Sequence, residues 1–201
     1  MKLEERKIVQ SVLHREIGLS WIPLSVKCSI KKKIIFSKTH WTSDKGPEVE
    51  FVKRLSFASA LYLELQEKLH KDKAFEIMKD MLVPIGCNEQ WAHLHTLANK
   101  GNPMENLMAF NDLMDKIGTP RFNRREYVKR SDSICHFVIT RCVFHDFFSE
   151  AGTPELTKLF CEIDRAFFPG AFSALEFHRG NSWENTIAYG KDHCEFVFQR
   201  K

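Results

Sequence analysis

Apolar residues change their spacing along this chain near residue 118, and that change limits the folds that the chain can adopt. From Glu48 to Ile117 they recur every three or four positions, which is typical of amphipathic helices. From Phe122 onward they alternate with polar residues over short stretches, which is typical of half-buried strands. We therefore predict a single α+β domain, with an N-terminal helical layer followed by an antiparallel sheet with inserted helices.

The part before residue 118 is predicted to be mainly helical. Its helices are expected at residues 2–16, at 48–69, at 72–82 with Asp72 as N-cap, after Gly86 through Leu97, and at 104–117 before Gly118. Residues 24–37 are rich in Val and Ile and predict one or two strands, and residues 38–47 predict a loop.

The part after residue 118 alternates between strands and helices. Strands are expected at 122–130, 134–142, 174–179, 184–189 and 192–199, and helices at 143–150 and from Pro154 to Phe168. We divide the chain into an N-terminal extension, residues 1–45, and an α+β domain, residues 46–201. The helical part of that domain is 46–118, and its sheet-and-helix part is 119–201.

Composition excludes several classes of function. The net charge of +4 is mild, and basic and acidic residues are interleaved, so we expect no nucleic acid partner. The N-terminus lacks the apolar stretch of a secretory signal, and no apolar stretch is long enough for a membrane helix. We therefore expect a cytoplasmic protein without a membrane partner, whose six cysteines are reduced thiols. A homo-oligomer is left open.

Four residues of the last third attract attention as candidates for chemistry: Cys142, Cys161, Asp164 and Cys194. Cys161 and Asp164 are three residues apart and share one face of a predicted helix. A thiolate attacks electrophilic carbon, and a neighbouring carboxylate can orient a water molecule. Convergence of all four is a hypothesis that depends on how the strands pair.

Each candidate has a simpler alternative. A free cysteine more often packs as a small apolar residue, and Asp164 could lie in solvent. Three thiolates, from Cys142, Cys161 and Cys194, could instead hold zinc or another divalent metal, although the pattern requires no cofactor. Arg141 and Arg179 could bind a substrate carboxylate or lie on the surface.

Five short stretches of the last third form a recognisable series: Val138–Cys142, Gly152–Leu156, Leu159–Asp164, Thr186–Ile187 with Gly190, and His193–Phe196. Over roughly residues 134–198 they resemble the C-terminal part of the L-2-amino-thiazoline-4-carboxylic acid hydrolase family. These stretches are similar to the family's VTRC strand end, G-x-P-E-L helix start, C-x-x-D helix and terminal G-x-x-C-D-F strand. Two features depart from the pattern: Glu195 stands where the family usually has Asp, and the stretch from Arg179 to Thr186 is changed.

The resemblance implies a hydrolase that opens a small cyclic C=N compound by adding water at its electrophilic carbon. We assign Cys161 as nucleophile and Asp164 as the group that orients water, with Cys142 and Cys194 beside them. His145 or His193 would transfer protons. Thr140, Arg141 and Arg179 are assigned to binding of the small-molecule substrate.

Two other functions compete with hydrolysis. A non-catalytic module could enclose a small apolar ligand or a metal, which the many phenylalanines of the last third would suit. A scaffold protein could retain the fold alone. Convergence of the thiols and Asp164 in one site would favour the enzyme or metal hypotheses.

Overall fold

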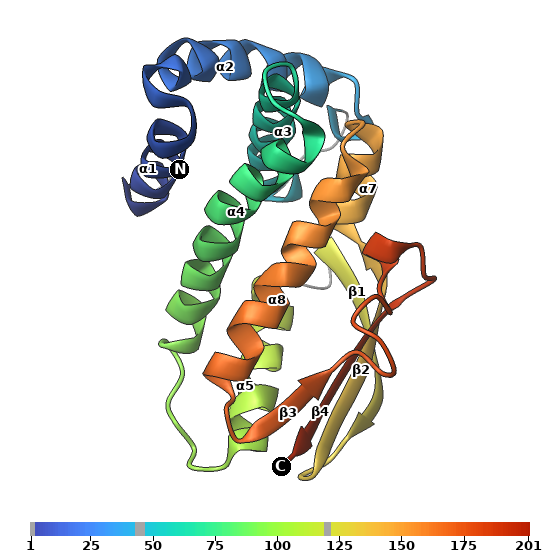
Figure 1. Cartoon of the computed structure of the whole chain (residues 1–201). Helices are drawn as coiled ribbons and strands as arrows, with labels where there is room; N and C mark the ends of the chain where they lie inside the picture. Colours follow the sequence, from blue (N-terminus) through green and yellow to red (C-terminus); the bar gives the residue numbers. More distant parts are fainter. Residues whose placement is uncertain (1–2, 43–46, 119–121) are drawn as a thin grey trace. The chain divides into compact units, whose positions relative to one another are not determined.

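The computed structural model describes residues 3–42, 47–118 and 122–201 of the chain (Figure 1). Its elements are α1 (Leu3–Ile17), η1 (Gly18–Ser20), α2 (Trp21–Ser37), η2 (His40–Thr42), α3 (Pro47–Gln66), α4 (Lys71–Leu94), α5 (Pro103–Ile117), β1 (Asn123–Arg130), β2 (Ile134–Cys142), α7 (Val143–Glu150), η3 (Pro154–Leu156), α8 (Thr157–Ala171), β3 (Leu175–His178), η4 (Ile187–Tyr189) and β4 (Cys194–Arg200). The prediction of an α+β fold, with an N-terminal helical region and an antiparallel sheet with inserted helices, is confirmed.

The chain forms two compact units, each made of two segments. The first unit comprises residues 1–86 and 144–160, and the second comprises residues 87–143 and 161–201. This division differs from the boundaries at residues 45 and 118 that we expected from the sequence, and those boundaries stay a prediction. No helix in the described part of the chain is long and apolar enough to cross a membrane.

In the first unit, the prediction of strands at residues 24–37 is wrong, because α2 is a helix. Leu24, Cys28 and Ile35 face inward and are buried. Further apolar side chains lie on the opposite, exposed side of the same helix. A segment that is apolar on two sides lacks the single stripe by which an amphipathic helix is recognised.

The predicted interruption at Gly86 is also wrong, because α4 continues from Lys71 to Leu94 and contains both Pro84 and Gly86. A glycine inside a helix costs only about 1 kcal/mol relative to alanine. Burial of one side of the helix, including Ile77 and Met81, outweighs that cost. Packing therefore overrides the local preference for a break.

The second unit contains a four-stranded antiparallel sheet in the order β1-β2-β4-β3. The predicted strand at 184–189 is wrong, because this stretch contains the 3₁₀ turn η4. The backbone of the stretch bonds to itself: the amides of Tyr189 and Lys191 both donate to the carbonyl of Thr186. These two amides are therefore not available to pair with a neighbouring strand.

One face of the sheet carries the core of the second unit. Figure 1 shows α5 and α8 on the same side of the sheet, and their side chains pack there against β2 and β4. Cys135, Phe137 and Ile139, which alternate along β2, are buried in this core. Helix α8 continues through Pro169 to Ala171, beyond its predicted end at Phe168.

A β-bulge in β2 changes which side chains face the core. Arg124 pairs with Arg141, but the next residue, Arg125, pairs with Ile139, so Thr140 is an extra residue on β2. Thr140 and Arg141 are consequently both exposed. The alternation shifts by one position after the bulge, and Cys142 packs against the core.

Phe167 lies at the centre of the aromatic core and is 1% exposed. Its ring centroid lies 5.3–5.4 Å from those of Phe168, Phe110 and Trp91. We expect Phe167→Ala to lower the free energy of unfolding by about 3–5 kcal/mol, because it leaves a cavity that these rings cannot fill. Urea unfolding followed by circular dichroism measures the change. Val128→Ala is the control, since Val128 is 61% exposed and its truncation should change stability by less than about 0.5 kcal/mol.

Candidate functional site

Helix α8 places two of the predicted site residues on its inner face in the second unit. Cys161 is buried and Asp164 is half-buried, and the spacing of three residues puts both on the side of Phe167 and Phe168. The strongly amphipathic sequence of α8 fixes this orientation, because its apolar side chains must face the sheet. Asp164 therefore lies among apolar side chains, where a carboxylate requires a hydrogen-bonding or charged partner.

Arg179, which directly follows β3, is that partner. Its Nη2 donates to Oδ2 of Asp164 at 2.6 Å, and the arginine side chain is only 1% exposed. The guanidinium lies over the rings of Phe196, Trp183 and Phe177, with its carbon 4.1, 4.8 and 5.8 Å from their centroids. Aromatic faces attract a cation, so this setting holds the guanidinium in place.

Asp164 is the carboxylate partner of this guanidinium. Nε and Nη1 of Arg179 are buried and have no hydrogen-bond partner among the residues that the structure describes, and neither has Nε1 of Trp183 beside them. Buried N–H groups are almost always paired, since leaving one unpaired costs about 1–3 kcal/mol. Three such donors on two adjacent side chains are therefore an arrangement that fits an anionic ligand.

Two thiols belong to the same cluster. Cys161 Sγ lies 3.8 Å from Oγ1 of Thr186, and Cys194 Sγ accepts the backbone N–H of Ile187 at 3.3 Å. Burial raises the pKa of Cys161 to about 12, which the nearby Arg179 only partly offsets. Burial likewise raises the pKa of Cys194. Both thiols are therefore protonated at neutral pH.

Asp164 has a different electrostatic setting. Burial raises its pKa to about 6, against the opposing attraction of Arg179 and, more weakly, of Arg125. A carboxyl group with a pKa near neutrality can gain and lose a proton under working conditions. Of the groups in the cluster, Asp164 is therefore the one suited to proton transfer.

Arg125 was not predicted from the sequence. It pairs with Asp115 at 3.0 Å and lies over the ring of Phe137, 4.5 Å from its centroid. Phe137 stacks on Phe196 at 4.8 Å, so the guanidiniums of Arg125 and Arg179 flank a stacked pair of rings. In the sequence Arg125 stands in a charged strand, and nothing distinguishes it from the exposed charges beside it.

Glu195 forms a second polar group next to the loop that carries Arg179. Its Oε2 accepts the Asn185 side-chain amide at 2.7 Å, and its Oε1 lies 3.0 Å from Nε2 of His136. Gly180 has a φ of +65°, and a Cβ there would lie 2.5 Å from Oε2 of Glu195. The turn after Arg179 therefore requires glycine, for its backbone and for the close approach of the carboxylate. The family motif contains this acidic position, although we assigned it no role.

The structure brings together only part of the predicted set. Cys161, Asp164, Cys194 and Arg179 share the cluster, whereas Cys142 packs at the edge of the core and Thr140 and Arg141 are exposed. The Thr140 hydroxyl donates to Glu126 of β1. His193 is half-buried directly before β4, and His145 belongs to α7 in the first unit. Within the described residues, no group of three or more His, Cys, Asp or Glu side chains is arranged to hold a metal ion.

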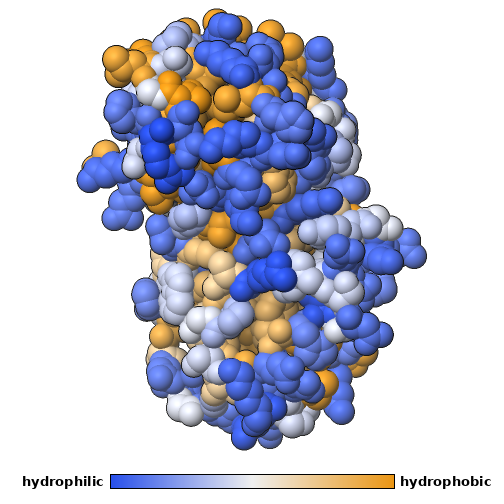
Figure 2. Space-filling model, viewed as in Figure 1, coloured by the Kyte–Doolittle hydropathy of each residue, from blue (hydrophilic) through white to orange (hydrophobic). Residues whose placement is uncertain are grey.

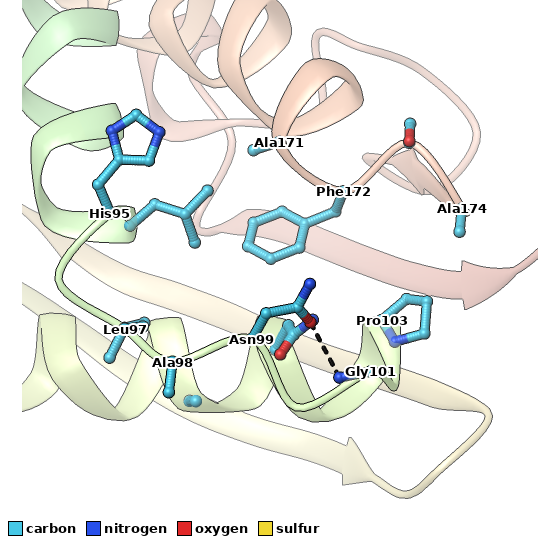
Figure 3. Close-up of a pocket in the computed structure, with 13 residues that line it drawn as sticks. His95, Leu97, Ala98, Asn99, Gly101, Pro103, Ala171, Phe172 and Ala174 are labelled. Atoms are coloured by element: carbon cyan, nitrogen blue, oxygen red, sulfur yellow. Dashed lines mark hydrogen bonds between the residues drawn. The ribbon is translucent and has the colours of Figure 1, made fainter.

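The second unit also contains a pocket that shares no residue with the cluster (Figure 3). Its volume is about 430 Å³, and it is lined by the end of α4, the segment 95–101, the first turns of α5 and the end of α8. Phe172 and Leu97 give it an apolar lining, and the carboxamide of Asn99 is held by Gly101 and Asn106. The pocket contains none of the predicted site residues.

The fold and the cluster define an α+β protein with a buried carboxylate–guanidinium site. Residues 50–198 match the sequence model of the L-2-amino-thiazoline-4-carboxylic acid hydrolase family, and the chain belongs to this family. The match confirms the family that the motifs of the last third predicted. The first 49 residues lie outside it.

Comparisons with individual proteins add little. A search of curated proteins found no match. Among solved structures, the Fe(II) unliganded H-NOX protein from K. algicida is 10% identical, covering 100% of this chain and 97% of that chain, with a TM-score of 0.39. An alanine-to-glycine mutant of that protein has the same identity and coverage and a TM-score of 0.38. Similarity at this level carries no argument about fold or function.

The raised pKa of Asp164 predicts how stability depends on pH. Its pKa is about 6 in the folded chain and about 3.9 when unfolded, so folding favours the protonated carboxyl. This stabilisation is present below pH about 4 and lost as the pH rises through about 6. Relative to Asp164→Asn, the wild type should lose on the order of 2 kcal/mol across this window, measured by urea unfolding. The exposed Asp192→Asn is the control. A pH-independent difference between wild type and Asp164→Asn would contradict the assigned pKa.

Proposed function

We propose that this protein hydrolyses small cyclic amidines that carry a carboxylate, the compound class of L-2-amino-thiazoline-4-carboxylic acid. The proposal rests on family membership and on one observation: the buried guanidinium of Arg179 has two unpaired N–H groups beside Asp164. A fixed, buried arginine with free donors binds a carboxylate through charge-assisted hydrogen bonds.

Arg179 has two roles in this proposal. Nη2 holds Asp164, and one of the remaining donors, Nε or Nη1, binds the substrate carboxylate, with Nε1 of Trp183 as an additional donor. One guanidinium then positions both the reacting compound and the group that acts on water. Such fixed positioning lowers the entropic cost of reaching the transition state.

Asp164 acts as general base. It takes a proton from water, and the hydroxide adds to the carbon that bears the exocyclic nitrogen. The electron pair of the C=N bond moves to the ring nitrogen, which takes the proton of the added hydroxyl. The carbonyl then forms as the carbon–sulfur bond breaks, and the proton held by Asp164 passes to the sulfur. One water is consumed, and the product carries a free thiol and an N-carbamoyl group. No electrons are exchanged with any other reactant.

The sequence also offered Cys161 as a nucleophile. A thiol whose pKa is raised to about 12 is almost entirely protonated at neutral pH, and the protonated form attacks carbon poorly. The route through water and Asp164 needs no ionised thiol. We therefore favour Asp164 as the group that acts on water. Cys161 and Cys194 line the site as uncharged thiols.

Substitution of Asp164 separates these two routes. We expect Asp164→Asn to lower kcat/KM for 2-amino-thiazoline-4-carboxylate by about 10²–10⁴-fold, and Cys161→Ala to change it by less than about tenfold. The rate of the wild type should fall below pH about 6, where Asp164 becomes protonated. Mass spectrometry of the N-carbamoyl product measures the rate, and Asp192→Asn is the control. Loss of activity in a folded Cys161→Ala variant would support the thiol as nucleophile instead.

The role of Arg179 is tested by changing enzyme and substrate together. Arg179→Lys keeps the charge but loses the fork of donors, and we expect a rise in KM of about tenfold to a hundredfold. The same compound without its carboxylate should react slowly in the wild type, and Arg179→Lys should slow it less than it slows the carboxylate, because only the positioning of Asp164 is then lost. The solvent-exposed Arg124→Lys is the control. Equal losses with both compounds would exclude carboxylate binding by Arg179.

A binding module without turnover is the second candidate, and the pocket of Figure 3 favours it. Its volume of about 430 Å³ falls within the range of small-ligand sites. If the pocket binds ligands, Ala109→Phe should weaken binding of the apolar fluorescent probe anilinonaphthalene sulfonate by about tenfold or more. The exposed Ala166→Phe is the matched control. No binding by the wild type would remove this candidate.

A further inference from the structure

The connection between β3 and β4 carries both side chains of the proposed carboxylate site. Arg179 is its first residue and Trp183 its fifth, and the Trp183 ring lies between the guanidiniums of Arg179 and Arg165, whose carbons are 4.8 and 4.9 Å from its centroid. The exposed residues in the first half of the connection are polar. Figure 2 shows mostly hydrophilic atoms over the part of the surface where the connection lies in Figure 1. The path of this connection therefore determines where the buried donors point.

Glu195 of β4 contacts both ends of residues 179–185, which we call the arginine loop. At the beginning of the loop, Oε2 of Glu195 occupies the space beside Gly180, where a Cβ would lie only 2.5 Å from it. At the end of the loop, the backbone N–H of Glu195 donates to the carbonyl of Asn185 at 3.2 Å. The same Oε2 also accepts the Asn185 side-chain amide at 2.7 Å. One residue of the sheet thus joins the two ends of the loop.

Hydrogen bonds inside the arginine loop are local and shape its turn. The N–H of Asn185 donates to the carbonyl of Ser182 at 3.1 Å, and the N–H of Glu184 donates to the Ser182 hydroxyl at 3.2 Å. These bonds fold the turn, whereas the contacts with Glu195 attach it to a neighbouring strand. A loop without such an attachment samples many conformations, and a ligand that binds to it must supply the free energy of ordering it.

Glu195 itself lies outside the cluster of Asp164 and Arg179. Its neighbours on β4, Cys194 and Phe196, are buried in the core, so the side chain of Glu195 points to the other face of the sheet. On that face its Oε1 lies 3.0 Å from Nε2 of His136. Glu195 can therefore act on a bound carboxylate through the loop and not by direct contact.

We propose that Glu195 is a positioning residue for carboxylate recognition. It anchors the arginine loop so that Arg179 and Trp183 keep their donors directed at the substrate carboxylate. This inference rests on the proposed function and adds to it a residue that determines how tightly the substrate binds. Loss of the anchor weakens binding more than it slows the chemical step, because Asp164 is carried by α8 and not by the loop.

Kinetics with 2-amino-thiazoline-4-carboxylate test the proposal in the full chain. Glu195→Ala should raise KM about tenfold and change kcat by less than about threefold, since it removes binding and not chemistry. Glu195→Gln retains an acceptor for the Asn185 amide, so it should raise KM by less than about threefold. With the compound that lacks the carboxylate, Glu195→Ala should raise KM much less. Glu176→Ala, which removes an exposed carboxylate from the neighbouring strand β3, is the control.

Amide hydrogen exchange, followed by mass spectrometry, tests the anchor without reference to activity. In Glu195→Ala, residues 180–186 should exchange about tenfold faster or more, whereas β2 and α8 should exchange as in the wild type. Asn185→Ala should have a similar effect, and combining it with Glu195→Ala should add little, because both substitutions break the same contact. Unchanged exchange in the β2 and α8 segments also shows that each variant is folded.

The outcomes separate this inference from the proposed function. If the wild type hydrolyses the compound while Glu195→Ala leaves KM unchanged, or impairs both compounds equally, the positioning role is overturned and the proposed function stands. Unchanged exchange of residues 180–186 in Glu195→Ala, or a Glu195→Gln variant as impaired as Glu195→Ala, would likewise overturn the anchor. A folded wild type that hydrolyses neither compound would remove the proposed function, and the role of Glu195 in carboxylate recognition would fall with it.

Discussion

The buried guanidinium of Arg179 is the constraint on which the second unit depends. A cation at 1% exposure requires a counter-charge, and Asp164 supplies one from α8. This contact joins α8 to the end of β3. The aromatic rings around Arg179 then shield the pair from water, which strengthens the attraction between its charges. Removal of Asp164 would leave Arg179 charged and buried without this counter-charge.

Two irregularities of the backbone complete the arrangement. The bulge at Thr140 returns Cys142 to the core, and the turn at residues 187–189 presents the Ile187 amide to Cys194. Both irregularities lie near the cluster and not in the regular part of the sheet. Regular pairing would give each strand a strictly alternating set of side chains, and the polar groups could not gather at one end.

The sequence correctly predicted the elements whose apolar residues follow a single spacing, that of a helix or that of a strand. Strand β2 and helix α7 have the expected bounds. The side chains of β2 alternate regularly, and residues that end a helix follow α7. Helix α2 was missed, since its Val and Ile residues lie on an exposed ridge while other apolar residues face inward. The extent of α4 was missed because its burial outweighs a central glycine.

The sequence predicted the candidate site only where the site residues lie close together in the chain. Cys161 and Asp164 could be placed on one helix face from their spacing alone. The contact of Asp164 with Arg179 joins α8 to the end of β3, and no local pattern encodes it. Thr140 and Arg141 were expected beside the site, but Thr140 lies on the face away from the core, and the extra residue in the strand turns Arg141 toward solvent as well. A bulge of this kind leaves no mark in the hydrophobic pattern.

Gly180 and Glu195 constrain one another in a way that bears on divergence within the family. Glu195 is one methylene longer than the aspartate usual at this position, and its carboxylate occupies the space that a side chain at residue 180 would need. A relative with the shorter acid would relieve the crowding at residue 180, while the left-handed backbone there would still favour glycine or asparagine. The two positions are therefore expected to covary, and aligned sequences would show the longer acid only alongside glycine.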